Sequence, residues 1–202
     1  MKKSTSVSPI SLTAALLLLP VLAHAHPGPP GHTHFSFAAG AAHPLSGIDH
    51  ILAMVAVGLW AAQLGRRALW AVPAAFVGLM AVGGALGMSG AVHHLPFVEQ
   101  GIMASVLILG LLIATAARLP LAASMAIVGM FAVFHGYAHG AEMPAAAGGY
   151  AYGAGFVIAT AALHATGVAA GLLVGKLANQ SWVRYAGGAI MACGCAMVLG
   201  WI

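Results

Sequence analysis

Long apolar segments separated by short polar breaks dominate this chain. Six such segments follow one another in the C-terminal four-fifths of the sequence, and each is near the length that an α-helix needs to cross a bilayer. They run approximately over 47–64, 69–88, 97–117, 121–139, 150–174 and 182–202. The breaks carry Pro, Gly or charged residues, and such short connections favour neighbouring antiparallel helices. The pattern therefore predicts an all-α protein, a polytopic membrane helix bundle with six transmembrane helices.

The N-terminus has the features of a secretory signal peptide over residues 1–25. Lys2 and Lys3 supply a charged start, and an apolar centre and a small-residue A-x-A cleavage motif follow. An uncleaved first helix is the alternative. Cleavage would leave residues 26–42 as a His/Pro/Gly-rich periplasmic tail ahead of a six-helix transmembrane domain over 43–202. The histidines of this tail would either collect metal or belong to a polar linker.

The composition supports a membrane protein independently of the segment pattern. Hydrophobic residues make up 61% of the chain and charged residues only 5%, whereas about a quarter of a soluble domain is charged. So few charges could not cover the surface of a soluble protein of this size. The net charge of +4 comes without a basic patch, so we expect no nucleic-acid partner, and the basic residues are better interpreted as topology signals.

The basic residues predict the orientation in the membrane. With a cleaved signal peptide the mature N-terminus is periplasmic, and the breaks alternate between the two sides. Every basic residue of the mature chain then lies inside, as the positive-inside tendency requires. These residues are Arg66, Arg67, Arg118, Lys176 and Arg184. The predicted location is therefore a bacterial inner membrane.

The first apolar segment opens with residues that suit a divalent metal. The stretch HPLSGIDH, residues 43–50, contains two imidazoles and one of only three acidic residues in the chain. His43 and His50 would share a face if the helix began near Pro44, which is acceptable in a first turn. Together with the carboxylate of Asp49 they could bind a divalent ion. A polar helix cap at the level of the lipid headgroups is the alternative.

The fourth apolar segment ends in a second cluster of the same kind. The stretch FHGYAHGAE, residues 134–142, places His135, His139 and Glu142 at i, i+4 and i+7, on one stripe of a helix. Two histidines at this spacing are common in protein cores, but here another of the rare acids accompanies them. Both motifs fall at the same predicted side of the membrane. We therefore expect them to form two halves of one site, with His50 and His139 close enough to share an ion.

Taken together, the two motifs resemble those of the HupE/UreJ family. The resemblance rests on HPLSGIDHILAMVAVGLWA, residues 43–61, and on FHGYAHGAE, and it extends from the signal peptide to the last helix. That family consists of small membrane proteins associated with nickel supply to hydrogenase and urease. The resemblance implies a nickel permease, not an enzyme, with cobalt as a second candidate metal, no permanently bound cofactor, and hydrogenase or urease maturation proteins as partners. The metal-handling residues that it implies are His43, Asp49, His50, His135, His139 and Glu142.

The sequence also bears on the energy source for transport and on two alternative functions. No GxxxxGK[ST] phosphate-binding loop occurs, so we expect transport without ATP. A divalent ion that enters at a negative-inside potential gains about 4–5 kcal/mol per 100 mV. A membrane-embedded zinc-dependent hydrolase is the main alternative, with Glu142 or Glu99 as its base. A haem-binding cytochrome would need His135 and His164 to face each other across two helices.

Several polar residues allow two interpretations. His93 and His94, with Glu99, form either an entry funnel or a polar loop. His164 stands alone, deeper in the fifth segment, and is either a core histidine or a relay point below the entry site. Met143, beside Glu142, is either a packing residue or a soft ligand for copper(I).

Overall fold

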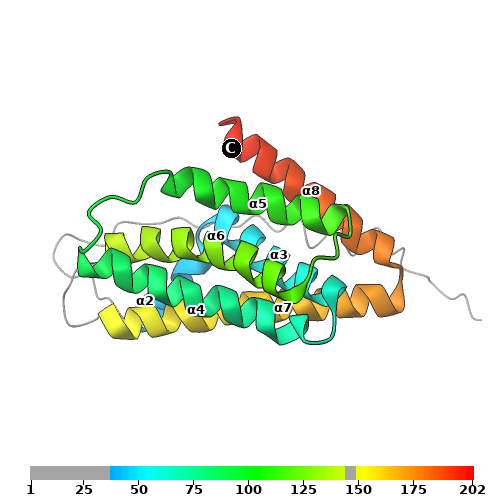
Figure 1. The fold of residues 1–202 in the computed structure, drawn as a ribbon, viewed down its shortest axis with the longest axis horizontal. Helices are drawn as coiled ribbons and strands as arrows, with labels where there is room; N and C mark the ends of the chain where they lie inside the picture. The colour runs from blue at the N-terminus through cyan, green and yellow to red at the C-terminus, as the bar shows by residue number, and fades with distance from the viewer. Residues whose placement is uncertain (1–36, 144–148) are drawn as a thin grey trace, which may run out of the picture. The chain divides into compact units, whose positions relative to one another are not determined.

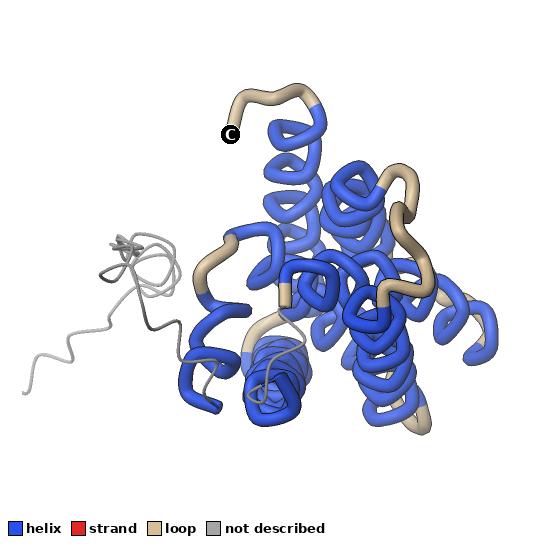
Figure 2. The backbone as a smooth tube through the Cα atoms, turned by 90° about the vertical axis from the view of Figure 1, so that its left-hand side faces the viewer, coloured by secondary structure: helices blue, strands red, loops and turns tan. Residues whose placement is uncertain are grey.

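The computed structural model describes residues 37–143 and 149–202 of the 202-residue chain, and all of them belong to one compact unit. These residues form helices and no strand, which confirms the all-α prediction (Figures 1 and 2). The predicted signal peptide and residues 26–36 of the predicted tail lie outside the described residues. In chain order the helices are α2 (Phe37–Ala42), the 3-10 helix η1 (His43–Leu45), α3 (Ile48–Leu64), α4 (Ala68–Ser89), α5 (Val98–Ala114), α6 (Leu121–Glu142), α7 (Gly149–Leu177) and α8 (Gln180–Val198).

Helix ends lie where the sequence supplies turn residues. α3 stops at Gly65 and α4 at Gly90, whose φ angles of 69° and 64° suit glycine. Pro120 stands directly before α6, where its missing N–H interrupts no helix. The side chain of Asn179 accepts the backbone N–H of Ser181 and caps α8. These signals place the breaks within a few residues of the predicted ones.

Several helices have the length and apolarity of membrane spans. α4, α6 and α7 each meet both requirements. A fourth candidate combines α2 and η1 with α3, and its two parts are bent by 83° relative to each other. α5 is apolar but has only 17 residues, and α8 does not reach the apolarity of the longer helices. The membrane character of the chain is therefore confirmed, whereas the number of six spans stays a prediction.

The bend before α3 contradicts the expectation that one helix carries both His43 and His50. η1 contains Pro44, and Gly47 has an extended backbone with φ −103° and ψ 126°, so the chain turns before α3 begins. η1 packs against both α3 and α7. His43 therefore reaches the site from a separate short helix rather than from the face of α3. Residues 37–42, assigned to the tail by the sequence, form α2 and pack on α7.

Three close helix pairs build the body of the unit: α4 with α6, α5 with α8, and α3 with α7 (Figure 1). Glycines lie where the helices cross. Gly136 of α6 faces the backbone of Met80 in α4, Gly58 of α3 faces the backbone of His164 in α7, and Gly110 of α5 faces α8. A Cβ atom at these positions would collide with the backbone of the partner helix. Small residues thus allow the close helix approach that is typical of membrane proteins.

The two ends of α3 differ in the residues that surround them. Arg66, Arg67 and Arg118 line one cleft at its C-terminal end. His50 lies in the first turn, about 21 Å along the helix from Leu64 at 1.5 Å per residue. The basic side chains and His50 of the first motif are therefore separated along the bundle, in agreement with the predicted charge pattern.

Candidate metal centre

Four histidine rings from the two motifs meet at the N-terminal end of α3. His43 comes from η1, His50 from α3, and His135 and His139 from α6. Ring centroids of neighbouring members are 4.4–4.6 Å apart. We call these four residues the histidine cluster. The predicted approach of the two motifs, and of His50 to His139 in particular, is thereby confirmed.

The ring nitrogens of the cluster face one another. Nδ1 of His135 lies 3.1 Å from Nε2 of His50, and Nε2 of His139 lies against that same nitrogen. The other nitrogen of His139, Nδ1, lies 2.9 Å from Nε2 of His43. Two nitrogens that bind one metal at about 2.0–2.1 Å each cannot be more than about 4.2 Å apart. Each of these pairs falls within that limit, so the spacing of each pair fits an ion bound between its two nitrogens.

Asp49 lies behind His50 rather than at the centre of the cluster. Its Oδ1 accepts the backbone N–H of His50 at 2.8 Å and lies 3.2 Å from Nδ1 of the same residue. A carboxylate in this position holds the proton on Nδ1 and leaves Nε2 as a free acceptor. Gly47 makes room for the arrangement, because a Cβ there would collide with the Asp49 carboxylate. Asp49 is thus placed to orient a ligand.

Ser105 of α5 orients His135 in a similar way, and the sequence analysis missed it. The Ser105 hydroxyl donates to the carbonyl of Ile102 at 2.6 Å, so its oxygen accepts the Nε2–H of His135 at 3.0 Å. Nδ1 of His135 is then unprotonated. A serine inside an apolar segment is a signal that the sequence does contain, but spacing alone cannot reveal its partner on another helix.

These two supporting contacts make the buried side of the cluster attractive to a cation. Asp49 and Ser105 hold the protons of His50 and His135 on the outer edges of the two rings, so unprotonated nitrogens face each other at 3.1 Å. Their lone pairs repel unless a positive charge lies between them. His50 is only 5% exposed and His135 is 0% exposed, so a cation bound there would be shielded from water.

Glu142 extends the cluster toward the surface. A carboxylate oxygen of Glu142 and ring nitrogens of His43 and His139 all lie within 4.8 Å of one another. Glu142 is exposed, and the two histidines are half-buried. His139 belongs to both sides of the cluster, because one of its nitrogens faces His43 and the other faces His50. The site therefore has an exposed side with a carboxylate and a buried side with imidazole ligands.

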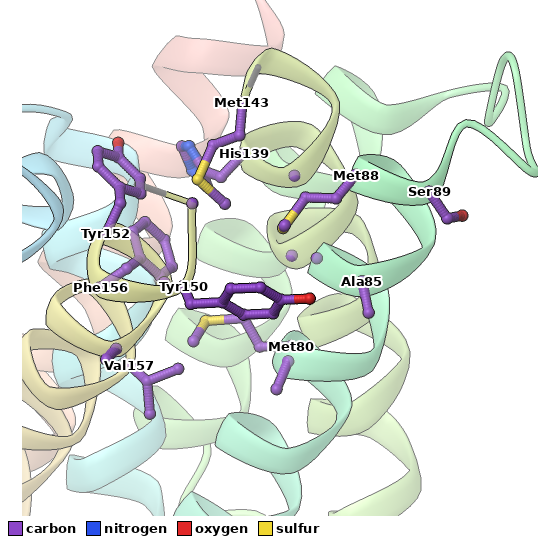
Figure 3. Close-up of a pocket in the computed structure, with 17 residues that line it drawn as sticks. Met80, Ala85, Met88, Ser89, His139, Met143, Tyr150, Tyr152, Phe156 and Val157 are labelled. Atoms are coloured by element: carbon purple, nitrogen blue, oxygen red, sulfur yellow. The ribbon is translucent and has the colours of Figure 1, made fainter. Parts of the chain in front are cut away.

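A cavity of about 690 Å³ leads to the cluster between α4, α6 and α7. His139 forms part of its wall, next to Met143 (Figure 3). Most of the lining is apolar, and the thioether of Met88 and the ring of Tyr150 also contribute to it (Figure 3). The cavity gives small solutes a route to the half-buried face of His139.

A smaller cavity of about 540 Å³ adjoins Glu142 on the other side of α6. His93, His94 and Glu99 line it together with Glu142. The hydroxyl of Tyr137 in α6 donates to a backbone carbonyl of the α4–α5 connection at 2.8 Å and holds this connection near α6. The third polar group predicted from the sequence thus lies beside the exposed side of the site, outside the histidine cluster itself.

The chain is similar to known proteins along nearly its whole length. The family model described as HupE / UreJ protein matches residues 14–197. The chain is also 47% identical over 194 residues to Protein HupE of Rhizobium leguminosarum bv. viciae, an alignment that covers 96% of this chain and 98% of that protein. No solved structure matches the chain. The family match includes both motifs that build the histidine cluster.

Proposed function

Because the chain belongs to the HupE/UreJ family, whose members are metal transport and accessory proteins and not enzymes, we propose that it carries nickel ions, or alternatively cobalt ions, across the membrane. The observation that carries this proposal is that ring nitrogens of the two motifs face each other in pairs, and the spacing of each pair fits an ion bound between them. Membership of this family also excludes the zinc hydrolase considered from the sequence. The proposed metal-handling residues are His43, Asp49, His50, His135, His139 and Glu142.

The proposed membrane arrangement has six spans after a cleaved signal peptide. α4, α6 and α7 supply three spans, the bent segment with α3 a fourth, and α5 and α8 the remaining two. The positive-inside tendency then places the cleft of Arg66, Arg67 and Arg118 in the cytoplasm of a bacterial cell. The histidine cluster, at the opposite end of α3, faces the periplasm, so that the ion enters from that side.

In this proposal the ion binds the exposed side of the site first. Glu142 offers an anionic oxygen, and His43 and His139 offer imidazole nitrogens, which together suit nickel(II) and cobalt(II). Since His139 also faces His50, it can pass the ion to the buried side without releasing it to water. The negative charge of Asp49, directly behind His50, offsets part of the charge of the ion there.

The membrane potential is a sufficient energy source for this transport. At about 2.3 kcal/mol per elementary charge and 100 mV, a divalent cation gains about 4–5 kcal/mol on entering a negative interior. The pathway therefore needs no ATP. Ions delivered to the cytoplasm would serve hydrogenase or urease maturation proteins.

A double-mutant cycle on nickel uptake tests the shared site. In cells that produce the chain, His50→Ala and His139→Ala should each remove most uptake of radiolabelled nickel, because both take a nitrogen from the same ion. The double variant should lose little more. Competition by cobalt, zinc and copper ranks the metals, and the membrane level of each variant serves as the control.

Two results would contradict the proposal in different ways. Losses that add in free energy would mean that His50 and His139 act at separate sites. A wild-type chain that is present in the membrane but accumulates neither nickel nor cobalt would contradict the transport function itself.

A further inference from the structure

Two buried polar side chains on α7 carry atoms that no hydrogen bond satisfies. Thr160 is 0% exposed and His164 is 1% exposed. Among the described residues neither Oγ1 of Thr160 nor Nε2 of His164 has a hydrogen-bond partner. The two residues are four positions apart and therefore lie on one face of the helix. Buried polar atoms are nearly always paired in folded proteins, so this pair, which we call the inner pair, requires an explanation.

The hydrogen bond of His164 defines which of its nitrogens is available. Nδ1 lies 2.8 Å from the carbonyl oxygen of Met54, which can only accept, so Nδ1 carries the proton and donates it. Nε2 is therefore left with a free lone pair. A neutral imidazole with a free Nε2 is a common ligand of transition metals. The hydroxyl oxygen of Thr160 adds a second, weaker donor on the same face.

The inner pair directly follows the histidine cluster along two helices. Met54, which holds His164, lies one helical turn, or about 6 Å, beyond His50 in α3. On α7, one turn before Thr160, the ring of Phe156 lies 4.7 Å from the ring of His139. A single stripe of α7 thus runs from the cluster to the inner pair.

One aromatic ring from α4 separates the two groups. The ring centroid of Phe76 lies 5.7 Å from that of His135 in the cluster and 5.0 Å from that of His164. Phe76 is 0% exposed. An ion that leaves His135 toward the interior of the bundle therefore reaches His164 as the next imidazole, past one apolar side chain.

We propose that Thr160 and His164 form an inner station that holds the divalent transition-metal ion after it leaves the histidine cluster. The inference rests on the proposed transport function. An ion in the interior of a membrane bundle needs ligands, because charge at that depth is costly. The inner pair offers fewer donors than the cluster and no carboxylate, so the ion binds there weakly and can move on, as conduction requires.

A substitution that removes only the Thr160 hydroxyl tests this station. Thr160→Val has the same shape, so thermal stability should stay the same or rise, since an unpaired hydroxyl is replaced by a methyl group. Nickel binding to the purified protein in detergent should persist at the cluster, whereas uptake in cells should fall about tenfold or more. Thr166→Val is the matched control, because Thr166 is exposed on the same helix and bonds to the carbonyl of Ala162.

A second variant separates the two nitrogens of His164. The amide of His164→Asn can still donate to the Met54 carbonyl but provides no equivalent of Nε2, so it should reproduce the effect of Thr160→Val. Should neither variant accumulate, cobalt(II) titration of purified His164→Cys decides. A thiolate-to-cobalt absorption band above the wild-type background, which includes Cys193 and Cys195, supports the station, and its absence contradicts it.

The outcomes distinguish this inference from the transport function. Wild-type uptake in both variants would overturn the inner station and leave transport intact, and the pair would then be buried side chains that only pack. Where a loss of uptake follows a loss of stability or of membrane level, the cobalt(II) titration of His164→Cys decides instead. A wild-type chain without uptake of nickel or cobalt would overturn both proposals together.

Discussion

The histidine cluster and the inner pair are both buried polar groups, but they differ in how their atoms are supported. In the cluster, Asp49 holds His50 and Ser105 holds His135, so that each ring presents a chosen nitrogen. In the inner pair only the Met54 carbonyl fixes His164. Supported ligands bind a metal more tightly, because their orientation costs nothing when the ion arrives. In the proposed transport the cluster would therefore select the ion, and the inner pair would release it.

The burial of the side chains increases along the proposed path of the ion, from the exposed side of the cluster to the inner pair. Glu142 is exposed, His43 and His139 are half-buried, and His135 and His164 are at most 1% exposed. The anionic ligand lies at the exposed end, where the ion still carries part of its hydration shell. Neutral ligands take over where water is excluded. Because the solvent exposure of the ligands decreases in this way, a divalent ion can lose its hydration shell in steps rather than at once.

Of the variants that test the difference between the cluster and the inner pair, Asp49→Asn should have the largest effect on nickel uptake. It removes the carboxylate that orients His50. The new amide can donate to Nδ1, and the proton of the ring then moves to Nε2, the nitrogen that faces the cluster. The negative charge behind the ligand is lost as well. We expect nickel uptake to fall about 100-fold, at the upper end for changes in ligand-supporting residues.

The measurement is radiolabelled nickel uptake at equal membrane level, with nickel binding to the purified variant as a second reading. Both should fall together, because the defect lies in the cluster. Nickel uptake at the wild-type level would show that Asp49 neither orients His50 for binding nor contributes to binding of the ion. If the variant still binds nickel but no longer takes it up, Asp49 acts in a step of transport after binding at the cluster.

Ser105→Ala should have a smaller effect of the same kind. Without the hydroxyl, the Nε2–H of His135 has no acceptor, and the ring can change its protonated nitrogen or rotate. We expect about a tenfold loss of nickel affinity, measured as a shift of half-maximal uptake to higher nickel concentration. Ser124→Ala is the matched control, since Ser124 is also fully buried but bonds locally, to the carbonyl of Pro120 directly before its own helix. Equal shifts in both variants would mean a general packing effect.

The sequence was sufficient for the parts of the site that depend on local spacing. The stripe of His135, His139 and Glu142 is correct, because all three residues lie on the continuous helix α6. The positions of the helices also follow from apolar segments and turn residues. The shared location of the two motifs was predictable from the alternation of the breaks, since it does not depend on side-chain detail.

The features that the sequence could not provide all depend on contacts between helices. Because of the 83° bend before α3, His43 reaches the cluster from η1 rather than from the face of α3. No rule of sequence spacing distinguishes such a bend from a continuous helix. Ser105 and Thr160 are single polar residues in apolar segments, and only the packing of α5 on α6 and of α7 on α3 gives them neighbours. The orienting role of Asp49 likewise depends on side-chain geometry, because adjacent residues on a helix normally point in different directions.

Gly58→Ala, at the crossing of α3 and α7, should have the smallest effect on uptake and tests whether the cluster and the inner pair respond separately to packing. A Cβ at this position would collide with the backbone carbonyl of His164, so the two helices must separate there. We expect a loss of about 1–3 kcal/mol in the free energy of unfolding, as for other overpacked sites. Gly78→Ala is the control, because a Cβ at that position of α4 meets open space. It should instead stabilise the helix by about 0.5–1 kcal/mol.

Thermal unfolding in detergent measures the stability of both glycine variants, and nickel binding and uptake show which region responds. Gly58 lies two turns beyond His50 but directly against the backbone of His164, so the shift should disturb the inner pair more than the cluster. Gly58→Ala should therefore keep its nickel affinity and lose part of its uptake. Equal losses of affinity and uptake would show that the two regions respond to packing as one unit, and the division of the pathway into a selecting site and a releasing site would have to be abandoned.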